Sequence, residues 1–140
     1  MTEWKIPECF YRVSVKALVL DESRTKFLIV KEDTGKWELP GGGLDWGMNS
    51  HDELRREIRE EMGLELTWIA DNPCYFLVGE TSNTGIWATN ILYEATLESL
   101  DFTPSAECTD IRFVDKSEVT QIEIPTNLRE LAKQFDPKNH

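Results

Sequence analysis

The sequence has no long hydrophobic run and few of the residues that form disulfides or zinc sites. No stretch approaches the ~18 apolar residues of a membrane-spanning helix, and Met1 to Lys5 lacks the apolar core of a signal peptide. The three cysteines, Cys9, Cys74 and Cys108, form neither a C-x-x-C pair nor a zinc pattern, and only two histidines are present. We therefore expect a cytoplasmic protein with reduced cysteines, no membrane contact and no histidine-based metal site.

Basic residues are in the minority. The chain has 15 Lys and Arg against 26 Asp and Glu, which gives a net charge of −11. Binding to a nucleic-acid backbone requires a basic face, so we do not expect a nucleic-acid duplex as a partner. A small phosphorylated substrate is still compatible with this charge, because bound metal ions reverse the local field. The length of 140 residues predicts one domain, residues 1–140.

The most informative segment is a predicted helix rich in glutamate. Ser50 followed by Glu53 fits the capping-box pattern at a helix start, and Gly63 fits the left-handed residue that ends a helix. We therefore predict a helix over about residues 51–62. Its apolar stripe consists of three residues that we expect to face inward: Leu54, Ile58 and Met62.

Three carboxylates lie beside that apolar stripe. Glu57, Glu60 and Glu61 fall within about a third of the helix circumference, and clustered carboxylates suit a hard cation such as Mg²⁺. The alternative is an ordinary solvated face, neutralised by the arginines of the same helix: Arg55, Arg56 and Arg59. The preceding glycines, Gly41 to Gly43, favour the first interpretation, because glycine-rich loops hold phosphates through backbone N–H groups.

Together these residues resemble the Nudix box, G-x5-E-x7-R-E-U-x-E-E-x-G-U, the signature of the Nudix (MutT-like) hydrolases. Gly42 matches the first glycine, and Arg56 to Leu64 matches the whole second half at the correct spacing. The single departure is Met48, which stands where the pattern has glutamate. Methionine can neither bind a hard cation nor hold an arginine. The candidates to replace that glutamate are Asp45, Asp52 and Glu53.

The resemblance implies a hydrolase that uses Mg²⁺ or Mn²⁺ to cleave the diphosphate linkage of a nucleoside diphosphate derivative. A nucleoside triphosphate pyrophosphohydrolase is the default expectation for the substrate, which is a small phosphorylated nucleotide. The alternative, suggested by Met48, is a catalytically impaired Nudix-fold module that binds nucleotides or has a regulatory role. A homodimer is common among similar proteins.

The resemblance also implies roles for individual residues. The implied metal ligands are Glu57, Glu60, Glu61 and the backbone carbonyl of Gly42. The implied catalytic residues are Glu57, Glu60 and Arg56. Glu57 lies near the attacking water in some members of the family. Arg56 orients a glutamate of the cluster, or else forms a surface ion pair with Asp52 or Glu60.

Substrate contacts and a further acidic residue are expected outside the acidic helix. The candidate substrate-binding residues are Gly41, Gly42, Gly43 and Trp46. Many members of the family also draw an acidic ligand or base from outside the box, and the candidates here are Glu107 and Asp110.

The rest of the chain alternates between extended and helical patterns, which predicts an α/β fold. The predicted strands are residues 11–20, 26–31, 36–39, 65–70, 75–79, 86–97 and 111–114, and we expect the first two to pair as a hairpin. A polar turn is predicted over 81–85, a helical turn over 116–119 and an amphipathic helix over 126–135. The resemblance implies that these elements form an α-β-α sandwich around a mixed sheet.

Overall fold

The computed structural model describes residue 5 and residues 8–81, 85–122 and 126–140. The predicted turn over 81–85 therefore lies largely outside the described residues. Within the described ranges, the strands are β1 (Arg12–Leu18), β2 (Phe27–Lys31), β3 (Trp37–Glu38), β4 (Gly41–Gly43), β5 (Leu66–Ile69), β6 (Tyr75–Glu80), β7 (Trp87–Leu97) and β8 (Asp110–Val114). The helices are α1 (Ser50–Met62), α2 (Lys116–Val119), α3 (Thr126–Gln134) and a terminal 3-10 turn, Pro137–Asn139.

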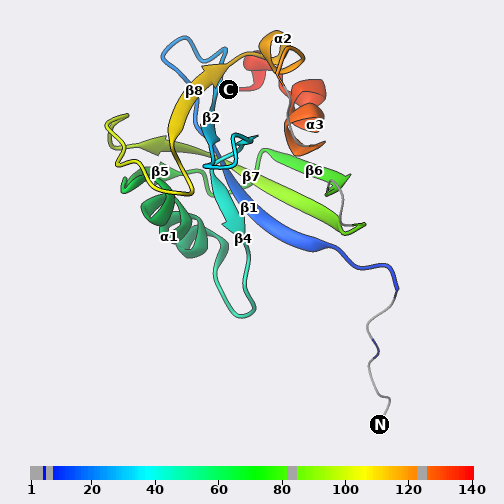
Figure 1. Ribbon diagram of the computed structural model, residues 1–140. Coiled ribbons are helices and arrows are strands. Elements are labelled where there is room, and N and C mark those ends of the chain that lie inside the picture. The colour runs from blue at the N-terminus through cyan, green and yellow to red at the C-terminus, as the bar shows by residue number, and fades with distance from the viewer. Residues whose placement is uncertain (1–4, 6–7, 82–84, 123–125) are drawn as a thin grey trace.

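The central strand of the fold is β7, which pairs along both of its edges. It runs parallel to β1, from the pair Arg12 and Ala88 to the pair Leu18 and Glu94. Its other edge pairs antiparallel first with β6 and then with β5, while β4 adds to the far side of β1. A second, three-stranded sheet has the order β3-β2-β8. The mixed sheet and the α/β class are therefore as predicted (Figure 1).

The predicted hairpin between the first two strands forms only next to its turn. Both edges of β1 are occupied, by β4 and β7, so β2 pairs instead with β3 and β8 in the other sheet. Only a short connection joins the two strands, through a bridge between Leu20 and Phe27 and a hydrogen bond from Leu28 N to Val19 O of 2.9 Å.

Gly41 to Gly43 form a strand, although we predicted a loop there. Gly43 pairs with Ser14 and Gly41 pairs with Lys16. Three glycines have low intrinsic preference for a strand, so the local pattern did not indicate one. The neighbouring β1 supplies the pairing, and the consequence is that this short strand lies directly against α1.

Helices cover the sheets on two sides, as the predicted sandwich requires (Figure 1). On one side, α1 buries Leu54, Ile58 and Met62 completely in a core that includes residues of β1, β2, β5 and β7. On the other side, α3 contributes Leu128 and Leu131 to a second core. Within the described part of the chain, none of the helices has the length and hydrophobicity needed to cross a membrane.

The ends of α1 show one wrong prediction and one that is confirmed. Asn49, not Ser50, caps the helix, because its side-chain oxygen accepts hydrogen bonds from the backbone N–H of His51 (2.9 Å) and Asp52 (3.3 Å). Asparagine and serine are equally good caps, so sequence alone does not separate adjacent candidates. At the other end Gly63 has φ 66° and its N–H donates to a carbonyl of the last turn, as predicted.

Candidate metal-binding and catalytic site

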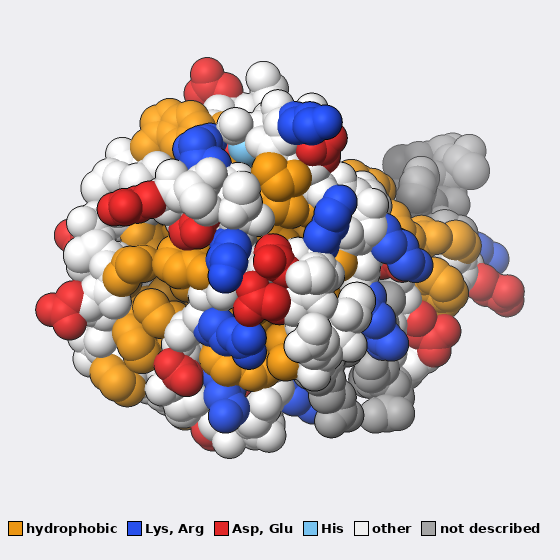
Figure 2. Space-filling model, turned by 90° about the horizontal axis from the view of Figure 1, so that it is seen from above, with side chains coloured by type: hydrophobic (Ala, Val, Ile, Leu, Met, Phe, Trp, Pro, Cys, Tyr) orange, Lys and Arg blue, Asp and Glu red, His pale blue; other side chains and the backbone are white. Residues whose placement is uncertain are grey.

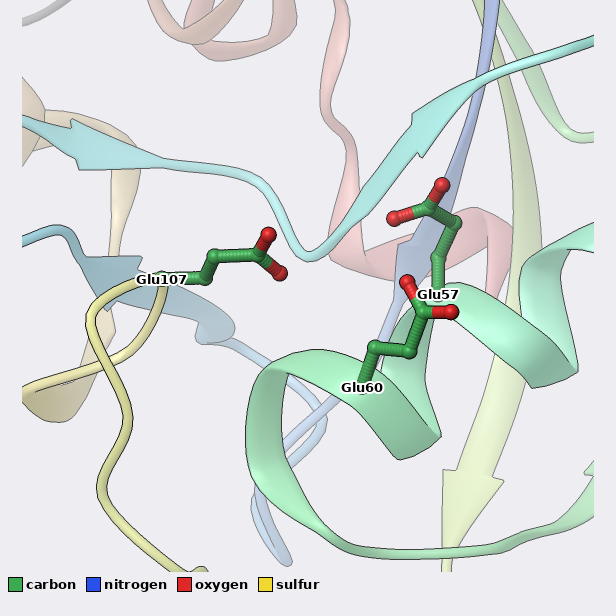
Figure 3. Close-up of side chains that lie close together, drawn as sticks. All are labelled: Glu57, Glu60 and Glu107. Carbon is green, nitrogen blue, oxygen red and sulfur yellow. The ribbon is translucent and has the colours of Figure 1, made fainter.

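Three carboxylates converge beside α1. Two of them belong to the metal ligands that the box implies, and the third was a candidate from outside the box. Side-chain oxygens of Glu57, Glu60 and Glu107 all lie within 4.8 Å of one another. Figure 3 shows that Glu57 and Glu60 project from α1 while Glu107 reaches toward them from the loop before β8. Of the two candidates outside the box, Glu107 therefore lies at the cluster. The Asp110 carboxylate instead accepts a hydrogen bond from the backbone N–H of Ile111 (2.8 Å).

The loop that carries Glu107 is tied to α1. The Ser105 hydroxyl donates to the backbone carbonyl of Glu61 at 2.9 Å, and the same hydroxyl oxygen accepts from the N–H of Glu107 and of Cys108. These bonds couple the end of α1 to the loop, so the position of Glu107 follows from tertiary structure and not from the box.

The cluster borders a recess of about 410 Å³, which we call the acidic recess. Its lining combines acidic side chains with two glycines and one lysine: Lys16, Glu32, Asp33, Gly41, Gly42, Glu57, Glu61, Ala106 and Glu107. Sequence reasoning missed Lys16, although a single lysine within the apolar pattern of β1 was a signal. Its ammonium group donates to the carbonyls of Leu39 (3.2 Å) and Gly41 (3.4 Å), which holds a nearly buried positive charge at the recess.

Gly42 lies against Glu57 so closely that a side chain would not fit. A Cβ atom added to Gly42 would lie 2.5 Å from Cδ of Glu57 and 2.6 Å from one carboxylate oxygen. Glycine is therefore required here by the approach of the helix to β4. This contact gives the first glycine of the box a physical role: it leaves room for the Glu57 carboxylate.

Glu61 is buried in the same recess, with 7% of its surface exposed. Its carboxylate accepts a hydrogen bond of 2.7 Å from the N–H of Gly41. Burial raises the pKa of Glu61 to about 8, with smaller contributions from the charges of Glu57 and Glu107, while the charge of Lys16 and the Gly41 N–H oppose the rise. This carboxyl therefore retains a proton more readily than an exposed glutamate does.

Glu57 is shifted in the same direction. Burial raises the pKa of Glu57, and the neighbouring carboxylates Glu60, Glu53 and Glu107 raise it further against the opposing charge of Arg56. Besides the effect of burial, the neighbouring negative charges thus repel the ionised form of Glu57. A divalent cation would relieve that repulsion, and oxygen ligands are the type that Mg²⁺ and Mn²⁺ prefer.

Arg56 is the arginine of α1 that contacts this cluster. Its guanidinium group donates to Glu57 at 2.9 Å and to Glu60 at 2.7 Å, and it also contacts Glu53. The Glu53 hydrogen bond is the largest cause of its raised pKa. The other two arginines point elsewhere. Arg59 pairs with Glu65 at 2.5 Å, and Arg55 donates to a backbone carbonyl of β5. The alternative of an arginine-neutralised face therefore holds for Arg56, which pairs with Glu57 and Glu60, but not for Arg55 and Arg59, whose partners lie outside the cluster.

Trp46, a predicted substrate contact, and Met48, the position that departs from the box, both lie away from the acidic recess. The loop between β4 and α1 projects away from the sheets (Figure 1), and on it Trp46 is 98% exposed. Met48, in the same loop, is 43% exposed. Neither is among the described residues that line the acidic recess. Of the candidates to replace the box glutamate, Asp45 lies near Arg12, whereas Glu53 contacts Arg56.

Comparisons with known proteins place the chain in a family. A family model of the NUDIX domain matches residues 10–135. The nucleoside triphosphatase NudI of Enterobacter sp. (strain 638) is 28% identical over 97 residues, which cover 64% of this chain and 69% of that protein. The RNA pyrophosphohydrolase of Ruthia magnifica subsp. Calyptogena magnifica is 33% identical over 60 residues, which cover 43% of this chain and 34% of that protein.

A solved structure agrees with the fold. The MutT protein of Methanosarcina mazei Go1 superposes with a TM-score of 0.76 at 24% sequence identity, covering 96% of this chain and 99% of that chain. The structure brings Glu57 and Glu60 of the box together. Because the family model matches nearly the whole chain, the chain belongs to the Nudix family of hydrolases, which act on phosphoric anhydride bonds.

Proposed function

We propose that the protein hydrolyses the diphosphate linkage of a nucleoside triphosphate with the help of Mg²⁺ or Mn²⁺. The observation that carries the proposal is the convergence of Glu57, Glu60 and Glu107, of which Glu57 and Glu107 line the acidic recess. In this reaction water adds to a phosphorus atom, and the bridging P–O bond breaks to release pyrophosphate.

Glu57, Glu60, Glu61 and Glu107 would hold the cation, together with the backbone carbonyl of Gly42. Such a cation neutralises charge on the phosphates and lowers the pKa of water that attacks them. Arg56 orients Glu57 and Glu60 through its two hydrogen bonds. Lys16 adds a fixed positive charge beside the acidic recess, where it favours a polyanionic substrate over a neutral one.

A second recess supports a substrate that carries a nucleobase. It has a volume of about 120 Å³, and Lys16 lines both recesses. Its other lining residues include Glu38, Asn90 and Asn127. One carboxylate oxygen of Glu38 is buried with no hydrogen-bond partner among the described residues, and Asn90 is 8% exposed. Carboxylate and amide groups are those that pair with the edge of a base, so we infer that this recess receives the nucleobase.

The net charge and the surface support a small substrate over a long nucleic acid. On the face shown in Figure 2, Lys and Arg side chains are interleaved with Asp and Glu. Proteins that bind a nucleic-acid backbone instead present a continuous basic track. A homodimer and a cytoplasmic location stay predictions from the sequence.

The experiment is a turnover assay on a panel of nucleotides with Mg²⁺, Mn²⁺ or EDTA. The panel contains nucleoside triphosphates, ADP-ribose, nucleotide sugars, dinucleoside polyphosphates and NADH, with inorganic tripolyphosphate as the comparator without a base. We expect metal-dependent pyrophosphate release from nucleoside triphosphates, little from tripolyphosphate, and loss of turnover in Glu57→Gln.

Met48 is the observation that favours a second candidate, a module that binds nucleotides without hydrolysing them. No turnover of any nucleotide in the panel, together with measurable nucleotide binding, would contradict the proposed hydrolase activity and support that module. Turnover of another class of substrate, such as ADP-ribose alone, would retain the hydrolase and refute the nucleoside triphosphate.

A further inference from the structure

We propose that Glu53 is a positioning residue of this site, which anchors Arg56 in place of the glutamate that the box has at position 48. The inference rests on the proposed function, since it concerns the orientation of Glu57 and Glu60. It assigns a role to a residue that the box leaves undefined.

Glu53 differs from Met48 in burial, in charge and in its contact with Arg56. Glu53 is completely buried, whereas Met48 is 43% exposed and has no charge. Glu53 lies one turn before Glu57 on α1 and contacts Nη2 of Arg56. The same Nη2 atom donates to Glu57, and Nη1 donates to Glu60. One guanidinium group therefore joins a buried carboxylate to two carboxylates of the cluster.

Stability alone does not explain a glutamate at this position. Its neighbours on the buried side of α1, Leu54 and Ile58, are apolar and completely buried. Burying a carboxylate is unfavourable unless it is fully paired, and Oε2 of Glu53 has no hydrogen-bond partner among the described residues. An apolar residue of similar size would pack there at lower cost. Glu53 is thus less favourable for packing than an apolar residue would be, and it contacts an arginine of the candidate site.

The contact restricts a side chain that would otherwise be mobile. The Arg56 side chain is 39% exposed, and an arginine on a helix surface samples many rotamers. A buried anchor holds its planar fork in one orientation, in which Nη2 also reaches Glu57 and Nη1 reaches Glu60. Removing the anchor would release Arg56 and, through it, the two carboxylates.

The same helix offers a matched control. Arg59 and Glu65 form an ion pair of 2.5 Å with both side chains about half exposed. Neither residue lines the acidic recess among the residues that the structure describes. Glu65→Gln thus removes an arginine partner from α1 without touching the proposed site.

The test compares wild type with Glu53→Gln, Glu53→Leu, Met48→Glu, the double variant Met48→Glu/Glu53→Gln, and Glu65→Gln. Mn²⁺ affinity is measured directly by electron paramagnetic resonance, turnover gives kcat and KM, and urea unfolding in EDTA gives stability. We expect Glu53→Gln and Glu53→Leu to weaken Mn²⁺ binding and to lower kcat by about tenfold or more, as loss of an outer-shell partner does, with KM for nucleotide changed less. Glu65→Gln should match wild type in both.

Two further results separate positioning from a structural role. Glu53→Leu should unfold at a urea concentration no lower than wild type while sharing the loss of Mn²⁺ affinity. Met48→Glu should restore about fivefold or more of kcat when added to Glu53→Gln, and should change wild type by less than about twofold, because the anchor is then already present.

Several outcomes would overturn the proposal. Unchanged Mn²⁺ affinity and kcat in Glu53→Gln would make Glu53 a structural residue only. An equal gain from Met48→Glu in both backgrounds, or no gain in either, would show that Glu53 does not replace a glutamate at 48. If wild type itself bound no Mn²⁺, the proposed function would fail and this inference with it. Mn²⁺ binding by wild type that the Glu53 variants leave unchanged would overturn the inference alone.

Discussion

Gly42→Ala should damage the site while leaving the fold intact. An alanine Cβ at this position would lie 2.5 Å from Cδ of Glu57, whereas carbon atoms in contact lie about 3.5–4.0 Å apart. The Glu57 carboxylate must therefore move by roughly 1 Å, away from its place beside Arg56. A misplacement of that size at a reacting centre costs about 100-fold in rate. We accordingly expect kcat/KM for the best nucleotide to fall by about 10- to 100-fold and Mn²⁺ affinity to fall with it.

Stability should respond differently from activity. Gly42 does not occupy the left-handed backbone region, so alanine does not strain the backbone there. The gain from restricting the unfolded chain, about +0.4 to +1 kcal/mol, then offsets the cost of displacing the Glu57 side chain. The matched control is Gly47→Ala. Gly47 has φ 78° and open space around its Cα, so alanine there strains the backbone by about 1–2 kcal/mol without contacting the site.

The assay pairs turnover with urea unfolding for both variants. Gly42→Ala should lose activity and keep its unfolding midpoint within the range of wild type, and Gly47→Ala should do the reverse. Full turnover in Gly42→Ala would refute the argument that this glycine exists to make room for Glu57. An equal loss of stability in the two variants would refute the assignment of strain to Gly47 alone.

Three other predictions follow from named residues. Folding raises the pKa of Glu61 from 4.5 to about 8. The protonated Glu61 carboxyl therefore contributes fully to the free energy of unfolding below pH 4.5, and this contribution is lost as the pH rises through 8. The loss is at most about 5 kcal/mol. Urea unfolding in EDTA at pH 5.5, 7 and 8.5 should show the fall, and Glu61→Gln should remove it. Metal binding near pH 7 should release protons, because Glu61 must ionise to bind the metal. Calorimetry in buffers of different ionisation enthalpy measures this release, and a binding heat that does not depend on the buffer would contradict the raised pKa of Glu61. Cys108, completely buried, should react with a thiol reagent only on unfolding, whereas exposed Cys9 should react at once; rapid labelling of Cys108 would contradict its burial.

The sequence predicted most of the elements, since their patterns are local. The acidic helix, the long strand that became β7 and the terminal helix with Leu128 and Leu131 inward all carry a clear period. The pairing of strands, in contrast, is not a local property of the sequence. Which edge of β1 receives which strand depends on contacts far apart in the chain, so the predicted hairpin formed only next to its turn and both edges of β1 pair with other strands. The strand Gly41–Gly43 likewise owes its conformation to β1 and not to its own residues.

The residues of the candidate site likewise fall into those that a local motif predicts and those that only the tertiary structure identifies. The box located Glu57, Glu60 and Arg56, because a motif fixes residues on one helix. Glu107 stayed one of two candidates until the loop bonds through Ser105 placed it, and Lys16 was missed. Glu53 belonged both to the predicted capping box and to the three candidates to replace the box glutamate, and the structure shows its carboxylate buried against Arg56. Side-chain direction and burial decide such roles, and a sequence pattern does not contain them.

The central claim is that carboxylates from α1 and from the loop before β8 bind one divalent cation. Its most direct test is a Mn²⁺ titration by electron paramagnetic resonance on wild type, Glu107→Gln and Asp110→Asn, the last being a matched control at the other candidate. We predict binding by wild type and Asp110→Asn, and binding weakened by about tenfold or more in Glu107→Gln. Equal Mn²⁺ affinity in all three proteins would contradict the account.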